Sequence, residues 1–189
     1  MTDDIRTQAL AALECAEMIH DEASVQSAAA EMARKISRDL AGSDPIIVCA
    51  MNGGLMPTAM LLPHLDFPLR LDYVHATRYR EKTRGEELHW QREPVRSFEG
   101  QHVLIVDDIL DEGHTLESIL DYFRRQRPAS LSAAVLVEKE HDRGVRPPVE
   151  YLGLKVPDRY VFGCGMDYKG YWRNLPAIHA LPADAEGLH

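Results

Sequence analysis

Near the middle of the chain the sequence runs Val103-Leu104-Ile105-Val106-Asp107-Asp108-Ile109-Leu110-Asp111-Glu112-Gly113-His114-Thr115-Leu116. Four apolar residues lead into two adjacent carboxylates, and a short loop with one glycine then leads into residues with helical spacing. Such an apolar run is typical of a strand that is buried on both faces of a parallel sheet. Ligands of these sheets bind beyond the carboxyl ends of the strands, so we expect a functional site here.

The sequence on either side has the same pattern of short strands and intervening helices. Apolar runs predict buried strands over Ile46–Met51 and Leu131–Val137, and helical periodicity predicts helices over Leu55–Leu62 and Thr115–Gln126. The alternating residues of Leu69–His75 predict a half-buried strand or an edge strand. We therefore predict an α/β fold with a central, mostly parallel sheet flanked by helices.

The first forty residues have the spacing of two helices. The first helix is expected to carry its apolar residues from Ile5 to Ile19. The second follows an apolar stripe from Val25 to Leu40, with Ser24 as its expected N-cap and Gly42 as its expected end.

Composition and charge exclude several classes of protein. The 189 residues are 45% apolar and 27% charged, as in ordinary globular domains, and the net charge of −9 argues against nucleic acid or an anionic membrane as partner. The N-terminus has no signal-peptide pattern, and no apolar run is long enough to span a bilayer. Three cysteines without a Cys-x-x-Cys pair imply no disulfide framework. We expect a cytoplasmic protein.

The residue types after the central strand suit a phosphorylated sugar. The loop Asp111–Thr115 can direct several backbone N–H groups and the Thr115 hydroxyl at a phosphate, and Gly113 lets the backbone turn closely around it. Asp107 and Asp108 can accept hydrogen bonds from ribose hydroxyls or help to hold Mg²⁺. An ordinary turn with helix-capping acids is the alternative. It does not explain four acids within six residues, which repel one another unless a cation or ligand organises them.

Residues 103–116 closely resemble the phosphoribosyl-pyrophosphate (PRPP) motif of the type I phosphoribosyltransferases, in their 6-oxopurine branch. The resemblance implies that Asp107 and Asp108 bind the ribose hydroxyls and take part in binding Mg²⁺. It implies that the loop Asp111–Thr115, which includes Glu112, Gly113 and His114, binds the 5′-phosphate. It also places Asp111 beside N7 of the purine as the proton-transfer group.

Two further segments resemble the pyrophosphate side of this family's site. Met51-Asn52-Gly53-Gly54 is similar to the loop whose backbone N–H groups bind pyrophosphate, although many members have Lys or Arg where Asn52 stands. Ala76-Thr77-Arg78-Tyr79 resembles the start of the flexible lid loop, which implies that Arg78 and Tyr79 meet the pyrophosphate. Many relatives have Ser in place of Arg78.

The last part of the chain resembles the segments that recognise the base. Lys139 is similar to the residue that donates to O6 of the purine, and residues 157–180 resemble the C-terminal hood. The resemblance implies that Tyr160 stacks on the base while the backbone at Val161 reads its edge. It further implies that Asp167 binds Mg²⁺ and that Arg173 contacts pyrophosphate.

The resemblance implies a single domain over residues 1–189, with N-terminal helices at 1–42, a core at 43–156 and the hood segment at 157–180. The implied reaction transfers the phosphoribosyl group from PRPP to hypoxanthine or guanine and gives the nucleoside monophosphate and pyrophosphate. Mg²⁺ and a homodimer or homotetramer are implied as well. Two alternatives stay open: a xanthine-preferring relative, and a non-catalytic regulator that binds PRPP or a nucleotide.

Overall fold

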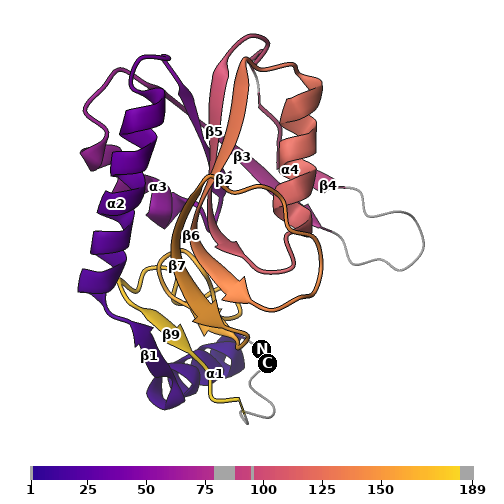
Figure 1. Ribbon diagram of the computed structural model, residues 1–189. Helices are drawn as coiled ribbons and strands as arrows, with labels where there is room; N and C mark the ends of the chain where they lie inside the picture. The colour runs from indigo at the N-terminus through magenta and orange to yellow at the C-terminus, as the bar shows by residue number, and fades with distance from the viewer. Residues whose placement is uncertain (1, 79–87, 95, 184–189) are drawn as a thin grey trace.

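A six-stranded sheet forms the centre of the computed structural model, which describes residues 2–78, 88–94 and 96–183 (Figure 1). The strands, in the spatial order β4-β3-β2-β5-β6-β7, are β2 (Ile46–Met51), β3 (Arg70–Arg78), β4 (Leu88–Arg92), β5 (His102–Leu110), β6 (Ser130–Glu140) and β7 (Tyr151–Pro157). All neighbours pair in parallel except β3 and β4. The predicted α/β class, with a mostly parallel sheet, is confirmed.

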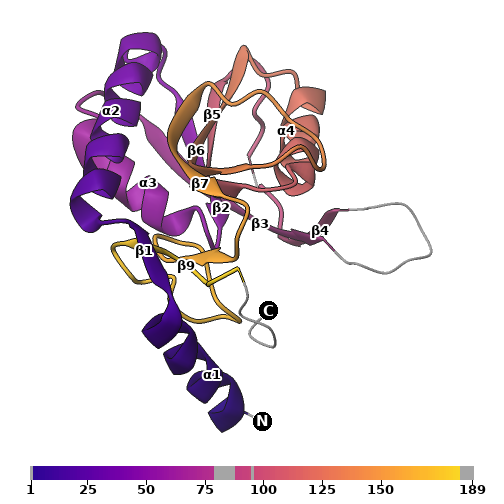
Figure 2. The same cartoon turned by 60° about the horizontal axis from the view of Figure 1, so that its bottom comes forward.

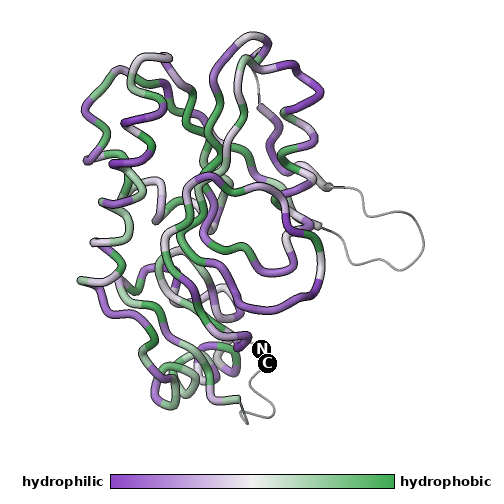
Figure 3. The backbone as a smooth tube through the Cα atoms, in the orientation of Figure 1, coloured by the Kyte–Doolittle hydropathy of each residue, from purple (hydrophilic) through white to green (hydrophobic). Residues whose placement is uncertain are grey.

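Helices cover both faces of this sheet. In Figure 1, α2 (Glu22–Leu40) and α3 (Leu55–Leu61) lie on one side, followed by a short 3₁₀ helix (Leu62–His64), and α4 (His114–Arg125) lies on the other. Each helix buries an apolar face against the strands, so the sheet separates two hydrophobic clusters. The apolar residues concentrate along the central strands in Figure 3. Burial of this surface is the main stabilising contribution, and it holds the carboxyl ends of β2, β5 and β6 side by side.

A second, three-stranded sheet joins the two ends of the chain. Strands β1 (Glu17–His20), β9 (Ile178–Ala180) and β8 (Val161–Phe162) pair antiparallel in the order β1-β9-β8. Helix α1 (Thr2–Cys15) leads away from this sheet, as Figure 2 shows. The expectation that helical structure continues to Ile19 is wrong, because Glu17–His20 pairs with a strand almost 160 residues away, and local periodicity does not report such a partner.

The start of α2 differs from the sequence prediction by three residues. The N-cap is Asp21 rather than Ser24, and Asp21 Oδ1 accepts a hydrogen bond of 2.8 Å from the backbone N–H of Ser24. A carboxylate at this position satisfies a free amide and interacts favourably with the helix dipole, which makes it a better cap than a residue inside the first turn. The helix ends at Leu40, two residues before Gly42.

Strand β3 buries one face, as predicted. The buried face is not the more hydrophobic one, which carries Leu71 and Tyr73. Val74 and Asp72 are buried, whereas Leu71 and Tyr73 are 51% and 42% exposed. Asp72 tolerates burial because the Arg96 guanidinium lies 3.0 Å from Oδ2. That ion pair depends on the segment after β4 folding back, so it is not visible in the local sequence.

The polar stretch after residue 78 forms a ribbon in part, since β4 pairs with the end of β3. Residues 79–87, on which the predicted lid loop falls, lie outside the described residues. Among the helices that the structure describes, none is long and apolar enough to cross a membrane.

Candidate active site

The carboxyl end of β5 carries two adjacent carboxylates, of which Asp108 is buried and Asp107 is half-buried. Asp107 and Asp108 are adjacent in this strand, and each bonds to backbone: Asp108 N–H donates to Asp107 Oδ1 at 3.0 Å, and Ile109 N–H donates to Asp108 Oδ1 at 2.8 Å. Burial raises the pKa of Asp107 well above its usual value, and the charge of Asp108 raises it further. Burial also raises the pKa of Asp108. The backbone donors therefore do not offset the cost of desolvating these carboxylates, and a sugar diol or a cation would supply further hydrogen bonds or positive charge.

The loop after β2 packs directly against Asp108. A Cβ placed on Gly53 would lie 2.0 Å from Asp108 Oδ2, so this position has room for glycine only. A Cβ on Gly165 would lie 2.1 Å from the carbonyl oxygen of Gly53. The peptide bond between Met51 and Asn52 is cis. The predicted pyrophosphate loop, the end of β5 and the hood thus meet in van der Waals contact.

The loop from Asp111 to Gly113 is interlocked with the segment after β6. Gly113 caps α4 in the left-handed conformation, with φ of 78°, and a Cβ there would lie 2.2 Å from the Val145 carbonyl oxygen. In the opposite direction, Val145 N–H donates to the Glu112 carbonyl at 2.8 Å, and Gly144 is equally crowded by Glu112. His114 opens α4 and is followed by Thr115. The predicted phosphate loop is therefore a fixed turn directed into a helix N-terminus, an arrangement that favours anions.

Asp111 lies between two donors at the end of β6. Lys139 Nζ donates to Oδ2 at 2.6 Å, and His141 Nε2 lies 2.7 Å from Oδ1. Burial by itself would raise the pKa of Asp111, but the hydrogen bonds from Lys139 and His141 outweigh it and hold the pKa below its usual value. Asp111 is thus ionised near neutral pH, as a proton acceptor must be.

His141 was not identified from the sequence, although a signal was present. It stands two residues after Lys139, so an extended chain directs both side chains to the same side. Its contact with Asp111 still requires β5 and β6 to be neighbours, which the sequence does not state by itself.

The hood carries the remaining predicted residues. Tyr160 Oη donates to the Asp167 carbonyl at 3.3 Å, and Val161 is buried at the start of β8. The Arg173 guanidinium forms an ion pair with Asp167, lies 3.9 Å from Asp108 Oδ2, and donates to the Gly165 carbonyl at 2.6 Å. Arg173 therefore links the hood to the acidic end of β5.

The structure brings most of the predicted residues together, with two exceptions. Arg78 ends β3, but its side chain is not described, and Tyr79 lies outside the described residues. No three His, Cys, Asp or Glu residues in the described part of the chain are grouped to hold a metal ion. Asp107, Asp108 and Asp167 therefore do not form a ready cage by themselves.

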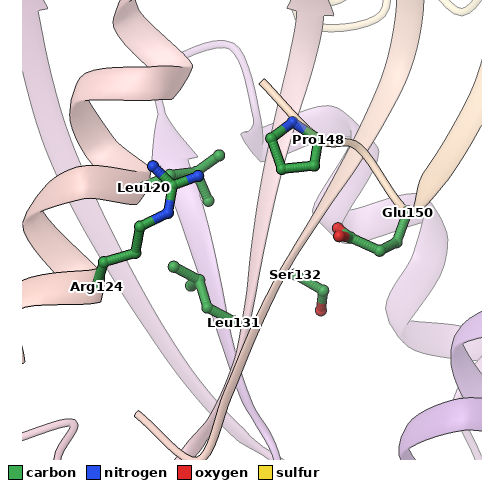
Figure 4. Close-up of a pocket in the computed structure, with 6 residues that line it drawn as sticks. All are labelled: Leu120, Arg124, Leu131, Ser132, Pro148 and Glu150. Atoms are coloured by element: carbon green, nitrogen blue, oxygen red, sulfur yellow. The ribbon is translucent and has the colours of Figure 1, made fainter. Parts of the chain in front are cut away.

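The structure also has a separate cavity of about 250 Å³, and Figure 4 shows the residues that line it. It is lined by Leu120, Arg124, Leu131, Ser132, Pro148 and Glu150. Its charged groups already have partners: Arg124 pairs with Glu117 and Asp121, and Glu150 accepts the Ala133 N–H at 2.8 Å. Leu131 and Ser132 begin β6, so this cavity lies at the other end of the sheet from Asp111.

Comparison with known proteins gives a consistent result. A profile of the phosphoribosyl transferase domain matches residues 16–169. Hypoxanthine-guanine phosphoribosyltransferase of Streptococcus pneumoniae (strain ATCC BAA-255 / R6) is 32% identical over 86% of this chain and 89% of its own length. Hypoxanthine-guanine-xanthine phosphoribosyltransferase of Tritrichomonas foetus is 30% identical over 87% and 90%.

A solved structure agrees with these relatives. A variant of hypoxanthine phosphoribosyltransferase from Trypanosoma cruzi, in complex with its product IMP, superposes with a TM-score of 0.82. It is 30% identical and covers 90% of this chain and 93% of its own.

Proposed function

This chain belongs to the phosphoribosyl transferase family, and we propose that it transfers the 5-phosphoribosyl group of PRPP to hypoxanthine or guanine. The products would be IMP or GMP and pyrophosphate, a purine-salvage reaction. One observation supports the choice of base: Lys139 Nζ and Asp111 Oδ2 lie 2.6 Å apart. On a 6-oxopurine, the O6 acceptor and N7 face the same edge of the base. A donor beside a proton acceptor matches that edge, whereas a 6-amino group offers Lys139 no acceptor.

We assign the other groups by their positions. Asp107 and Asp108 would accept hydrogen bonds from the ribose hydroxyls, and the loop Asp111–Thr115 would bind the 5′-phosphate. The loop at Asn52 and Gly53, together with Arg173, would bind the leaving pyrophosphate. The aromatic ring of Tyr160 would stack on the base, an interaction worth about 1–3 kcal/mol, and the Val161 backbone would read its edge.

The chemistry assigned to Asp111 is a proton transfer. As N9 of the base bonds to C1′ of the ribose, the bond from C1′ to the pyrophosphate oxygen breaks, and Asp111 takes the proton from N7. The lowered pKa keeps Asp111 ionised near neutral pH, so the carboxylate carries no proton before it accepts the one from N7. Loop amides and Arg173 would stabilise the negative charge that develops on the pyrophosphate.

The residues present fit Mg²⁺ as a cofactor. Desolvation raises the pKa values of Asp107 and Asp108, so a cation beside these carboxylates would be stabilised. Mg²⁺ commonly binds through one or two carboxylates together with substrate phosphates and water. Asp107, Asp108 and Asp167 would hold the ion with PRPP or pyrophosphate, where it neutralises phosphate charge.

The test is an absorbance assay with PRPP, Mg²⁺ and, in parallel, hypoxanthine, guanine, xanthine and adenine. We expect turnover of hypoxanthine or guanine and none of adenine. The Tritrichomonas foetus relative carries xanthine in its name, so xanthine preference is the second candidate, and the xanthine rate decides it. Binding of PRPP without turnover of any base would instead favour a regulator.

The metal assignment has its own test. Replacing Asp167 with Asn removes one of the proposed ligand charges, so we expect half-maximal velocity to need more Mg²⁺. Titration of velocity against Mg²⁺ at saturating PRPP measures this. An unchanged requirement would remove Asp167 from the metal site.

We further propose that the chain acts in the cytoplasm as a homodimer or homotetramer. Membership of the phosphoribosyl transferase family supports this proposal. Light scattering across a range of protein concentrations measures the assembly, and a monomer at all concentrations would contradict it.

A further inference from the structure

We propose that His141 is a positioning residue for the proton acceptor of this reaction: its Nε2–H holds one oxygen of Asp111 so that the other is free for the purine. This inference rests on the role proposed for Asp111. It adds a residue that lies outside the PRPP motif and outside the hood.

The side chain of His141 is buried and lies within hydrogen-bond distance of Asp111. Its side chain is 5% exposed, and its Nε2 lies 2.7 Å from Asp111 Oδ1. Lys139 takes the other oxygen, Oδ2, at 2.6 Å. The two oxygens of one carboxylate therefore have different donors, on a strand end and on the segment that follows it.

The hydrogen bonds to the other ring nitrogen fix the tautomer of His141. Nδ1 lies 3.1 Å from the backbone nitrogen of Arg143 and 3.0 Å from Arg146 Nη2. Both of these groups can only donate, so Nδ1 must be an acceptor without a proton. The ring proton is then on Nε2, where it points at Asp111.

Arg146 links the backbone of His141 to the backbone of Asp111. Its guanidinium donates to the His141 carbonyl at 2.6 Å and also to the backbone carbonyl of Asp111. The same segment contributes Val145 N–H to the Glu112 carbonyl at 2.8 Å. The imidazole and the loop that carries Asp111 are thus tied to each other through the backbone as well as through Nε2.

The two donors have separable roles. When a 6-oxopurine is bound, Lys139 must turn its ammonium group to O6, and Oδ2 becomes free to take the N7 proton. Asp111 then keeps one donor, His141, which prevents rotation of the carboxylate and favours its ionised form. If Lys139 were the only donor, base binding would leave the Asp111 carboxylate free to rotate and without a hydrogen bond that favours its ionised form.

Other charges face the same carboxylate, and an experiment on pH must hold them constant. On β6 the charged neighbour is Lys139, on its own loop it is Glu112, and on the segments after β6 and β7 they are Arg143, Arg146 and Asp158. Variants at His141 keep all of these charged residues, and Arg146 keeps the His141 carbonyl as an acceptor when Nδ1 is removed.

The experiment compares wild type with His141→Leu, which removes the donor, and His141→Gln, whose amide nitrogen supplies one. His102→Leu is the matched control, because His102 lies at the opposite end of β5 and bonds Ser130 at 2.8 Å. For each protein, kcat, the KM for PRPP and for hypoxanthine, the pH profile of kcat/KM and the thermal midpoint are measured.

We expect His141→Leu to lower kcat about 10-fold, with the KM for PRPP nearly unchanged, since one hydrogen bond to a charged group is lost. The acid limb of the pH profile should move to higher pH, because a carboxylate without its donor protonates more easily. His141→Gln should restore most of both effects, and His102→Leu should show neither.

A wild-type enzyme with turnover and a His141→Leu variant with unchanged kcat and pH profile would overturn the inference. So would an equal loss in His141→Gln. A wild type without turnover would refute the proposed function instead. NMR of the imidazole nitrogens in the wild-type protein needs no variant: a proton on Nε2 and none on Nδ1 supports the assignment, and a proton on Nδ1 overturns it.

Discussion

Two acidic sites lie three residues apart at the end of β5, and their electrostatic states are opposite. Asp111 has a donor on each carboxylate oxygen, and its pKa is held below the usual value despite burial. Asp107 and Asp108 are adjacent, the nearest Arg173 nitrogen lies 3.9 Å from Asp108 Oδ2, and desolvation raises the pKa of both carboxylates.

This difference in pKa distinguishes a carboxylate proposed to take part in the reaction, Asp111, from two carboxylates proposed to bind a ligand, Asp107 and Asp108. A base that must be ionised is already surrounded by donors, so little reorganisation is needed during the reaction. A pair of carboxylates that binds a diol or a cation has few donors in the unliganded protein. The ligand then supplies the missing hydrogen bonds or positive charge, and this favours binding. Each prediction below tests one side of this comparison.

The largest effect is expected at Asp111. Replacement with Asn keeps the shape and removes the proton acceptor, so kcat should fall about 10²–10⁴-fold. The affinity for PRPP should stay nearly intact, which calorimetry with PRPP and Mg²⁺ measures. If PRPP binding collapses as well, Asp111 belongs to the ligand-binding side, and the distinction between the two acidic sites fails.

The next effect is expected at Gly53, where the pyrophosphate loop touches Asp108. Replacement with Ala places a Cβ 2.0 Å from Asp108 Oδ2, and the resulting shift should cost about 1–3 kcal/mol of stability. It should also weaken PRPP binding. Gly42→Ala is the matched control, because a Cβ there meets nothing within 4 Å. Equal behaviour of the two variants in chemical denaturation would show that the contact with Asp108 is easily relieved.

A smaller effect of opposite sign is expected at Asp107. Replacement with Asn removes a carboxylate whose pKa is raised beside Asp108, so the unliganded protein should gain about 1 kcal/mol in the free energy of unfolding near neutral pH. PRPP binding should weaken at the same time. Denaturant titration without ligand measures the gain, with Asp66→Asn as a control on the exposed surface. A loss of stability would mean that the pair is satisfied within the fold.

The smallest effect is expected at the exposed ion pair of Arg143 and Asp158, whose charges lie near Asp111. The Arg143 guanidinium holds the pKa of Asp158 at about 2. An acid with a depressed pKa stabilises the fold above its ordinary pKa and loses that contribution as the pH falls toward 2. Asp158→Asn should therefore lower the thermal midpoint slightly near neutral pH, less at high salt, and least near pH 2, where Asp158 is already partly protonated. A deficit that is undiminished at pH 2 would have another cause.

Predictions from the sequence succeeded where the signal is local. The apolar run of Ile46–Met51 coincides with β2, and the run before Asp107 lies within β5, because a strand buried on both faces needs continuous apolar residues. The loop Asp111–Gly113 and the start of α4 follow from one glycine and the helical spacing after it.

Predictions failed where a distant segment decides. Glu17–His20 is a strand because β9 pairs with it, and Asp72 is buried because Arg96 lies beside it. His141 was missed because its role depends on Asp111, thirty residues earlier in the sequence.

The sequence by itself determined the α/β class, the position of the acidic strand end and the residue types that suit a phosphorylated ribose. Periodicity, apolar runs and turn residues carry that information within a few residues of each position. Only the tertiary structure decided that the pKa of Asp111 is lowered while the pKa values of Asp107 and Asp108 are raised. The state of a carboxylate depends on burial and on the donors within about 3 Å, and those donors reach Asp111 from β6 and the loop after it.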